Sequence, residues 1–251
     1  MNDSSLTAPT APLPPATEAL SPVAAVVGTF SKPSETFGRL VARPTWWLPL
    51  VLYAAVAMGT SLLLGPKVDW ERSAQEAMAQ QAERSGRAIP PEAIPRVAGF
   101  MKLTMTAGAP VFVAIVAFAM PAVLWGAARA FGGEVGYAQT ISLWLHANLP
   151  GVVKGVVSVP VILSLADASL NMKSVGTCLK SNVAAFLPET ASQALQTFGS
   201  FLDLFTLWSL VLVVIGFRKI PGLPKGAAVA IPVGLFAFVV LALTGLAALR
   251  G

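Results

Sequence analysis

The sequence predicts an all-α fold: a polytopic transmembrane helical bundle with five membrane spans and additional amphipathic interfacial helices. Two observations lead to this prediction. Hydrophobic residues make up 55% of the 251 residues and charged residues only 12%, which is about half the charge of a typical water-soluble domain. The apolar residues are also gathered into separate runs, each close to the roughly 20 residues that a helix needs to cross the hydrocarbon core.

The five predicted spans are continuous apolar runs without the two-residue alternation of a barrel strand, so each should be a helix whose backbone groups are bonded internally. They cover residues 46–65, 110–131, 141–165, 198–217 and 226–249. Together they predict a five-span membrane domain at residues 46–250.

The chain before the first span divides into two parts. Residues 1–22 are rich in Pro, Ala and Thr and lack the basic and apolar stretches of a secretory signal, which predicts a disordered cytoplasmic tail. Residues 23–45 form a predicted amphipathic segment with a break at Pro33.

The apolar residues of this amphipathic segment recur at helical spacing. They are Val23, Val26, Val27 and Phe30 before the break, and Phe37, Leu40 and Val41 after it. Two interpretations stay open: the short helices lie on the cytoplasmic leaflet, or they pack under the bundle as a collar. Trp46 and Trp47 indicate the headgroup level at which the first span begins.

The connection between the first two spans predicts an outer helical hairpin at residues 67–107. Its first helix should stop at Gly86, and its second should begin near Glu92 and run into the second span. Basic and acidic residues are mixed along the hairpin, without the excess of basic residues that is typical of cytoplasmic loops. This mixture is expected for the outer side of the membrane. The hairpin is large enough to cap the bundle or to offer a docking surface.

Basic residues in the short connections predict the orientation. With five alternating spans, seven of them fall on one side: Lys32, Arg39, Arg43, Arg129, Arg218, Lys219 and Lys225. The protein should therefore lie in the cytoplasmic (inner) membrane with its amino terminus in the cytoplasm and its carboxyl terminus outside. The net charge of +5 fits this topology, and no soluble basic face indicates a nucleic-acid partner.

The third span carries polar residues at four-residue spacing, which places them along one helical stripe. They are Ser142, His146, Pro150, Lys154 and Ser158, with Asn148 nearby. A lysine near mid-bilayer costs about 2.5–3.5 kcal/mol on the insertion scale and should face protein, water or a carboxylate. His146, Asn148, Lys154 and Asp203 are therefore the candidate intramembrane polar cluster.

Depth suggests a carboxylate partner for the lysine. At 1.5 Å per residue, Lys154 in the third span and Asp203 in the fourth reach nearly the same level of the membrane. We therefore predict that they form an ion pair. The alternative is that Asp203 lies at a hydrated helix end and Lys154 extends to the membrane surface. Gly151 and Gly155 predict close helix packing, with Gly126 and Ala127 of the second span as the expected neighbours.

Three stretches of the sequence resemble one known family. They are "FSKPSETFGRLVARPTWWLPL", "GGEVGYAQTISLWLHANLPGVVKGV" and "LDLFTLWSLVLVVIGFRK", in this order. They are similar to the Yip (Ypt-interacting protein) family of five-span membrane proteins in its bacterial form. The resemblance implies a cytoplasmic amino terminus and an outward carboxyl terminus. Eukaryotic members are adaptors that bind prenylated Rab-type GTPases and shape vesicle membranes. This chain lacks their "DLYGP" string, and only Gly136-Tyr137 matches their Gly-Tyr element.

No motif predicts an enzyme, a cofactor or a metal site. The lone Cys178 has no CxxC or Cys/His spacing, and His146 has no nucleophile at a recognisable spacing, which favours a hydrogen-bonded packing residue. We therefore expect a non-enzymatic scaffold or adaptor in membrane organisation. The alternative is a small-solute or proton permeation protein that uses the polar stripe. The expected partners are the lipid bilayer and an unidentified protein, and homo-oligomerisation stays open.

Overall fold

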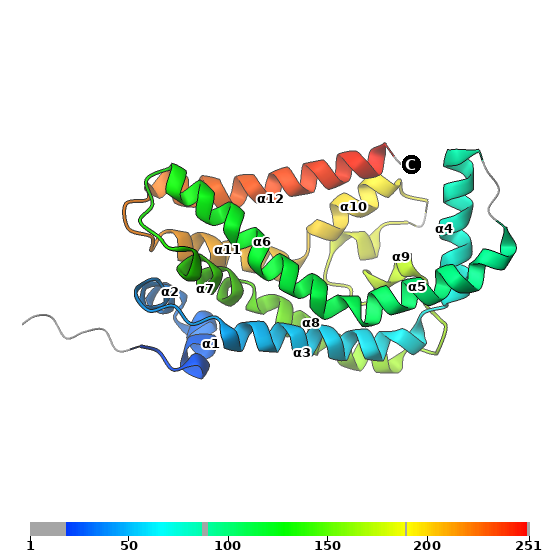
Figure 1. The fold of residues 1–251 in the computed structure, drawn as a ribbon, viewed down its shortest axis with the longest axis horizontal. Helices are drawn as coiled ribbons and strands as arrows, with labels where there is room; N and C mark the ends of the chain where they lie inside the picture. The colour runs from blue at the N-terminus through cyan, green and yellow to red at the C-terminus, as the bar shows by residue number, and fades with distance from the viewer. Residues whose placement is uncertain (1–18, 87–89, 189, 250–251) are drawn as a thin grey trace, which may run out of the picture.

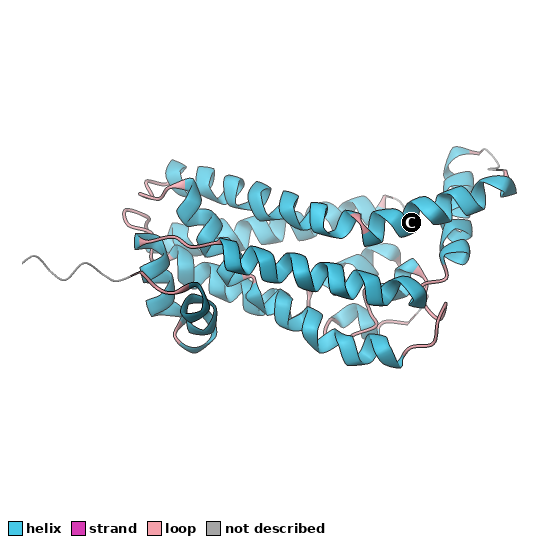
Figure 2. Ribbon diagram, turned by 60° about the horizontal axis from the view of Figure 1, so that its bottom comes forward, coloured by secondary structure: helices cyan, strands magenta, loops and turns pink. Residues whose placement is uncertain are grey.

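The structure, a computed structural model, describes residues 19–86, 90–188 and 190–249. These residues form an elongated helical bundle, and Figures 1 and 2 show helices and loops with no strand among them. The predicted all-α class is confirmed. Most of the predicted tail, up to residue 18, lies outside the described residues.

Two short helices precede the first long one. α1 covers Pro22–Ser31, and the Ser21 hydroxyl accepts a hydrogen bond from the backbone N–H of Ala24. α2 covers Pro33–Ala42. Proline fits the first helical position because its fixed φ suits a helix and its missing N–H is not needed there. The predicted break at Pro33 is therefore confirmed.

Four helical runs are long and apolar enough to cross a membrane. They are Trp47–Lys67, Gly108–Ala130, Tyr137–Ser164 and Lys225–Ala248. The first contains α3 (Trp47–Leu64) and η1 (Gly65–Lys67), the second is α6 (Gly108–Ala130), and the last is α12 (Lys225–Ala248). The third divides at Asn148 into α7 (Tyr137–Ala147) and α8 (Leu149–Ser164). These runs agree with four of the five predicted spans.

The fourth predicted span, residues 198–217, is not one continuous helix. It contains the end of α10 (Gln193–Phe201) and all of α11 (Leu204–Phe217), with a break at Leu202 and Asp203. α11 alone is shorter than the roughly 20 residues of a full crossing. Both helices pack against α12, and in Figure 1 they follow each other along its length.

The outer hairpin has the predicted ends. α4 (Trp70–Ser85) begins at Asp69, whose carboxylate accepts from Arg72 N–H, and ends at Gly86, whose φ of 64° favours glycine. After η2 (Pro91–Ala93), α5 (Ile94–Thr106) leads directly into α6. Two short pieces, α9 (Met172–Val175) and η3 (Val183–Phe186), lie in the connection between α8 and α10.

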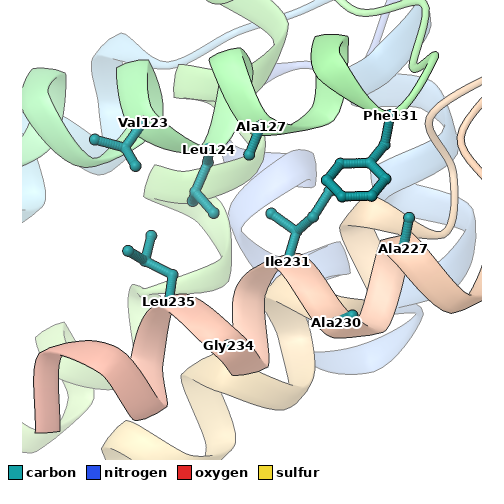
Figure 3. Close-up of a pocket in the computed structure, with 9 residues that line it drawn as sticks. All are labelled: Val123, Leu124, Ala127, Phe131, Ala227, Ala230, Ile231, Gly234 and Leu235. Atoms are coloured by element: carbon teal, nitrogen blue, oxygen red, sulfur yellow. The ribbon is translucent and has the colours of Figure 1, made fainter. Parts of the chain in front are cut away.

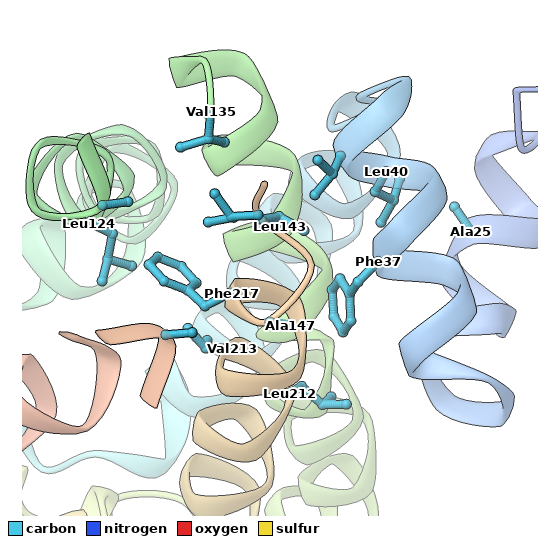
Figure 4. Close-up of a cluster of buried hydrophobic side chains, with 14 residues drawn as sticks. Ala25, Phe37, Leu40, Leu124, Val135, Leu143, Ala147, Leu212, Val213 and Phe217 are labelled. Atoms are coloured by element: carbon cyan, nitrogen blue, oxygen red, sulfur yellow. The ribbon is translucent and has the colours of Figure 1, made fainter. Parts of the chain in front are cut away.

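The main apolar core lies at the end of the bundle opposite α4. Phe37 and Leu40 of α2 pack there with Leu143 of α7 and Phe217 of α11 (Figure 4). Both Phe37 and Phe217 are almost fully buried. Of the two interpretations left open for this segment, the packing of α2 agrees with the collar, because its apolar face contacts the bundle.

Candidate functional site

The main polar site joins α8 to the break between α10 and α11. Lys154 Nζ lies 2.8 Å from Asp203 Oδ2. The Asp203 side chain is 1% exposed and the Lys154 side chain 34% exposed. The predicted ion pair is confirmed, and the carboxylate is the more deeply buried partner.

Asp203 also begins α11. Its Oδ1 accepts hydrogen bonds from the backbone N–H groups of Phe205 at 3.0 Å and Thr206 at 3.2 Å. An aspartate at this position satisfies backbone donors that have no partner inside the helix, and its negative charge interacts favourably with the positive helix end. This capping explains why the apolar run splits into two helices at Asp203.

The loop that carries Ser181, in the connection between α8 and α10, completes the site. The Ser181 hydroxyl donates to Asp203 Oδ2 at 2.5 Å, and the Ser181 carbonyl accepts from Leu204 N–H at 3.0 Å. Asn182 and Asp203 form an antiparallel bridge, and Val183 N–H donates to the Leu202 carbonyl at 3.2 Å. The loop thus bonds the backbone groups that the break leaves without helical partners, as an apolar environment requires.

The other two residues of the predicted polar cluster bond elsewhere. His146 is fully buried, and its Nδ1 lies 2.9 Å from the Ser142 carbonyl. The Asn148 side-chain amide donates to the Trp144 carbonyl at 2.9 Å. Within the part of the chain that the structure describes, no hydrogen bond or ion pair joins either residue to Lys154 or Asp203. The structure therefore brings together two of the four residues.

Asn148 lies between α7 and α8, where the third span divides. The Tyr53 hydroxyl of α3 donates to its backbone carbonyl. The same carbonyl also accepts from Gly151 N–H at 2.8 Å, so Tyr53 adds a second donor, from a neighbouring helix, at the junction of α7 and α8. Tyr53 was missed in the sequence because nothing in its own apolar run indicates this contact.

Gly151 and Gly155 face α3 rather than the second span. A Cβ added to Gly151 would meet the Tyr53 hydroxyl, and one added to Gly155 would clash with Val56. A Cβ on Gly126 would meet open space. The expected neighbours in the second span, Gly126 and Ala127, are therefore wrong, because the stripe of α8 that carries the two glycines turns toward α3.

Two cavities are lined in part by α6 and α12, and both are mainly apolar. The larger is a groove of about 310 Å³ between α6 and α12, lined by residues such as Leu124, Ala127 and Gly234 (Figure 3). The smaller, of about 120 Å³, has Asn148, Thr206 and Ser209 among its lining residues. No group of three metal-binding side chains occurs among the described residues. The polar atoms of the site bond to one another and connect α8, α11 and the loop at Ser181.

Comparison with known proteins gives one family and one relative. A model described as the Yip1 domain matches residues 27–247, from α1 to the end of α12. The membrane protein YknW of Bacillus subtilis (strain 168) is 26% identical over 204 residues, which cover 80% of each chain. No solved structure matches the chain.

Proposed function

We propose that this chain, which belongs to the Yip1 domain family, is a non-enzymatic scaffold or adaptor in the organisation of the cytoplasmic membrane. The family match confirms the resemblance noted in the sequence and identifies an integral membrane protein. The observation that supports a scaffold is the ion pair of Lys154 and Asp203, because both charges are used to connect elements. Intramembrane charges that serve transport usually line a hydrated path.

The proposal includes five spans, with α10 and α11 together forming the fourth. Their joint packing along α12 supports this arrangement. The loops at 131–136 and 218–224 also meet, since Glu134 N–H donates to the Pro221 carbonyl at 2.8 Å. The chain therefore returns to the end where α6 finished before it enters α12, which supports a crossing by the segment from α10 to α11.

The proposed orientation places the amino terminus in the cytoplasm. The seven basic residues of the short connections belong to the ends of α1, α2, α6, α11 and α12 that gather at one end of the bundle (Figure 1). Only Glu35 and Glu134 oppose them in the described parts of these connections. An excess of basic residues in short loops is typical of the cytoplasmic side.

The outer hairpin is the surface that we assign to a protein partner. Its base is fixed by the ion pair of Lys67 with Asp167 at 2.9 Å and by the bridge between Val68 and Leu170. α4 buries Ala74 and Met78 and leaves polar residues such as Gln75 exposed. A photo-crosslinking amino acid at Gln75 should give one defined protein adduct in native membranes. The same group at the exposed Leu243 of α12 is the lipid-facing control and should give none.

Permeation is the second candidate, because a helix broken at a buried carboxylate also occurs in transporters. Proteoliposomes that contain the full chain and a pH-sensitive dye separate the two functions. A scaffold should leave the proton flux equal to that of vesicles without protein. A higher flux that Asp203→Asn abolishes would overturn the scaffold in favour of permeation. Equal adducts at Gln75 and Leu243 would overturn the assignment of the hairpin.

A further inference from the structure

Helix α1 contacts the bundle through its small and polar residues. Ala25 and Thr29 are fully buried, whereas Val23 is 64% exposed, Val27 59% and Phe30 36%. At 3.6 residues per turn, Val23, Val27 and Phe30 share a face nearly opposite Ala25 and Thr29. A helix that covers a core surrounded by water turns its large apolar residues inward. α1 turns Val23 and Val27 outward and leaves Phe30 partly exposed at the edge of α11.

The outward face of α1 continues into the lipid-facing side of α11. The ring of Phe30 packs edge-on against Trp208, with 5.4 Å between ring centroids. Trp208 is 39% exposed, and Leu204 and Val211 on the same helix are more exposed still. Val27 and Phe30 therefore extend an apolar surface that already belongs to a membrane helix.

The position of Trp208 along α11 gives the depth of this contact. Trp208 lies nine residues before the end of α11 at Phe217, or about 14 Å at 1.5 Å per residue. Interfacial amphipathic helices bury their apolar face about 5–10 Å into the boundary of headgroups and acyl chains. Because Phe30 contacts Trp208, its ring lies within the apolar length of α11, deeper than this boundary and among the acyl chains.

The charge near α1 suggests which lipid it favours. Residues 22–31 carry no charged side chain, and the next residue is the exposed Lys32. Lys32 belongs to the end of the bundle where basic residues are in excess. A lysine near the membrane surface favours anionic headgroups.

We propose that α1 is a lipid-binding helix whose face of Val23, Val27 and Phe30 inserts into the leaflet at the basic end of the bundle, and that Lys32 selects an anionic phospholipid there. The identity of this leaflet as the cytoplasmic one rests on the proposed orientation; the insertion itself does not. α2 cannot take this role, because Phe37 and Leu40 are buried in the core.

A fluorescence experiment on the full chain tests the insertion. Cys178→Ser removes the native thiol, and Val27→Cys is labelled with an environment-sensitive dye in vesicles that contain phosphatidylcholine and phosphatidylglycerol. The exposed Ser34 of α2, as Ser34→Cys, is the matched control. The label at position 27 should report an apolar setting and be quenched by nitroxide-labelled lipid, whereas the control should report water. Val23→Cys provides a second site if the first variant does not accumulate.

The headgroup selection has its own readout. Nitroxide-labelled phosphatidylglycerol should quench the label at position 27 about five-fold more effectively than nitroxide-labelled phosphatidylcholine. Lys32→Gln should remove this preference while the label stays in an apolar setting. Equal quenching by the two lipids in the unmodified background would overturn the selection. A water-like signal at both positions 23 and 27, or disulfide crosslinks between position 27 of two copies, would overturn lipid insertion and favour water or a second copy.

Discussion

Asp203 is more deeply buried than Lys154. We therefore predict that single substitutions of these two residues lower the free energy of unfolding by different amounts. Lys154→Met leaves the 1% exposed carboxylate of Asp203 without its cation. Loss of one partner of a buried pair typically costs about 3–5 kcal/mol. Asp203→Asn should cost less, because the asparagine oxygen can still cap α11 and the 34% exposed lysine can extend toward the membrane surface. Thermal unfolding in detergent should therefore give a lower Tm for Lys154→Met.

The exposed pair of Arg72 and Glu76 on α4 is the control for this comparison. The Arg72 side chain is 67% exposed, and exposed pairs usually contribute about 0–1 kcal/mol. Arg72→Gln should therefore change the Tm little. Combining Lys154→Met with Asp203→Asn should recover part of the stability lost in Lys154→Met. If Asp203→Asn lowers the Tm more than Lys154→Met does, the carboxylate contributes mainly through its other bonds.

Individual residues of the site differ in how far the sequence reveals them. The pair of Lys154 and Asp203 was predictable, because the fixed rise of a helix converts residue counts into depths. Ser181 was not predictable, since its loop has no regular repeat from which a depth can be counted. His146 and Asn148 share the stripe of Lys154 in the sequence, but their polar atoms bond within their own helical segment. A shared stripe shows that side chains point to the same side of the helix, but it does not show which groups they bond.

At the scale of elements, the contact of α8 with α3 depends on the absence of a side chain at Gly155. A Cβ there would clash with Val56, whose branched side chain has little rotamer freedom in a helix. Overpacking usually costs about 1–3 kcal/mol, and the gain in helix propensity offsets about 1 kcal/mol of it, so Gly155→Ala should destabilise the fold by up to about 2 kcal/mol. A lower Tm of the purified protein would show the effect.

A compensating substitution separates packing from other causes. Val56→Ala removes the atom nearest to the added Cβ, so the double variant with Gly155→Ala should be more stable than Gly155→Ala alone. Gly126→Ala is the control, because its Cβ would meet open space, and it should leave the Tm unchanged or slightly higher. A Tm loss at Gly126 equal to that at Gly155 would contradict the assignment of the contact to α3 and α8.

The elements most accurately predicted are those whose ends depend on local chemistry. Pro33, Gly86 and the long apolar runs fix boundaries through backbone geometry and membrane thickness alone. The break in the fourth span was missed, because residues 198–217 were taken as one continuous apolar run, although aspartate also caps helices. The apolar face of α1 is exposed and that of α2 is buried. This difference was also unpredictable, since periodicity identifies an apolar face but not what covers it.

At the scale of the whole molecule, the number of spans decides where each connection lies. With four crossings, by the long apolar runs alone, the loop at 218–224 would lie outside and the carboxyl terminus in the cytoplasm. With five crossings the loop at 218–224 would lie in the cytoplasm and the carboxyl terminus outside. The hydrogen bond between Glu134 and Pro221 favours five, because it joins the loop at 218–224 to the loop at 131–136, which lies on the cytoplasmic side in either scheme.

Cysteine labelling in intact cells distinguishes these two schemes. In a Cys178→Ser background, Lys219→Cys should react with a membrane-impermeant maleimide only after the cells are opened, because the loop that carries it is cytoplasmic in the five-span scheme. A cysteine added after Gly251 should react in intact cells. The exposed Gln75 of the outer hairpin, as Gln75→Cys, is the control that lies outside in both schemes. Labelling of Lys219→Cys in intact cells, with protection of the carboxyl terminus, would show that α10 and α11 do not cross, and their shared packing along α12 would then need both helices to lie within one half of the bilayer.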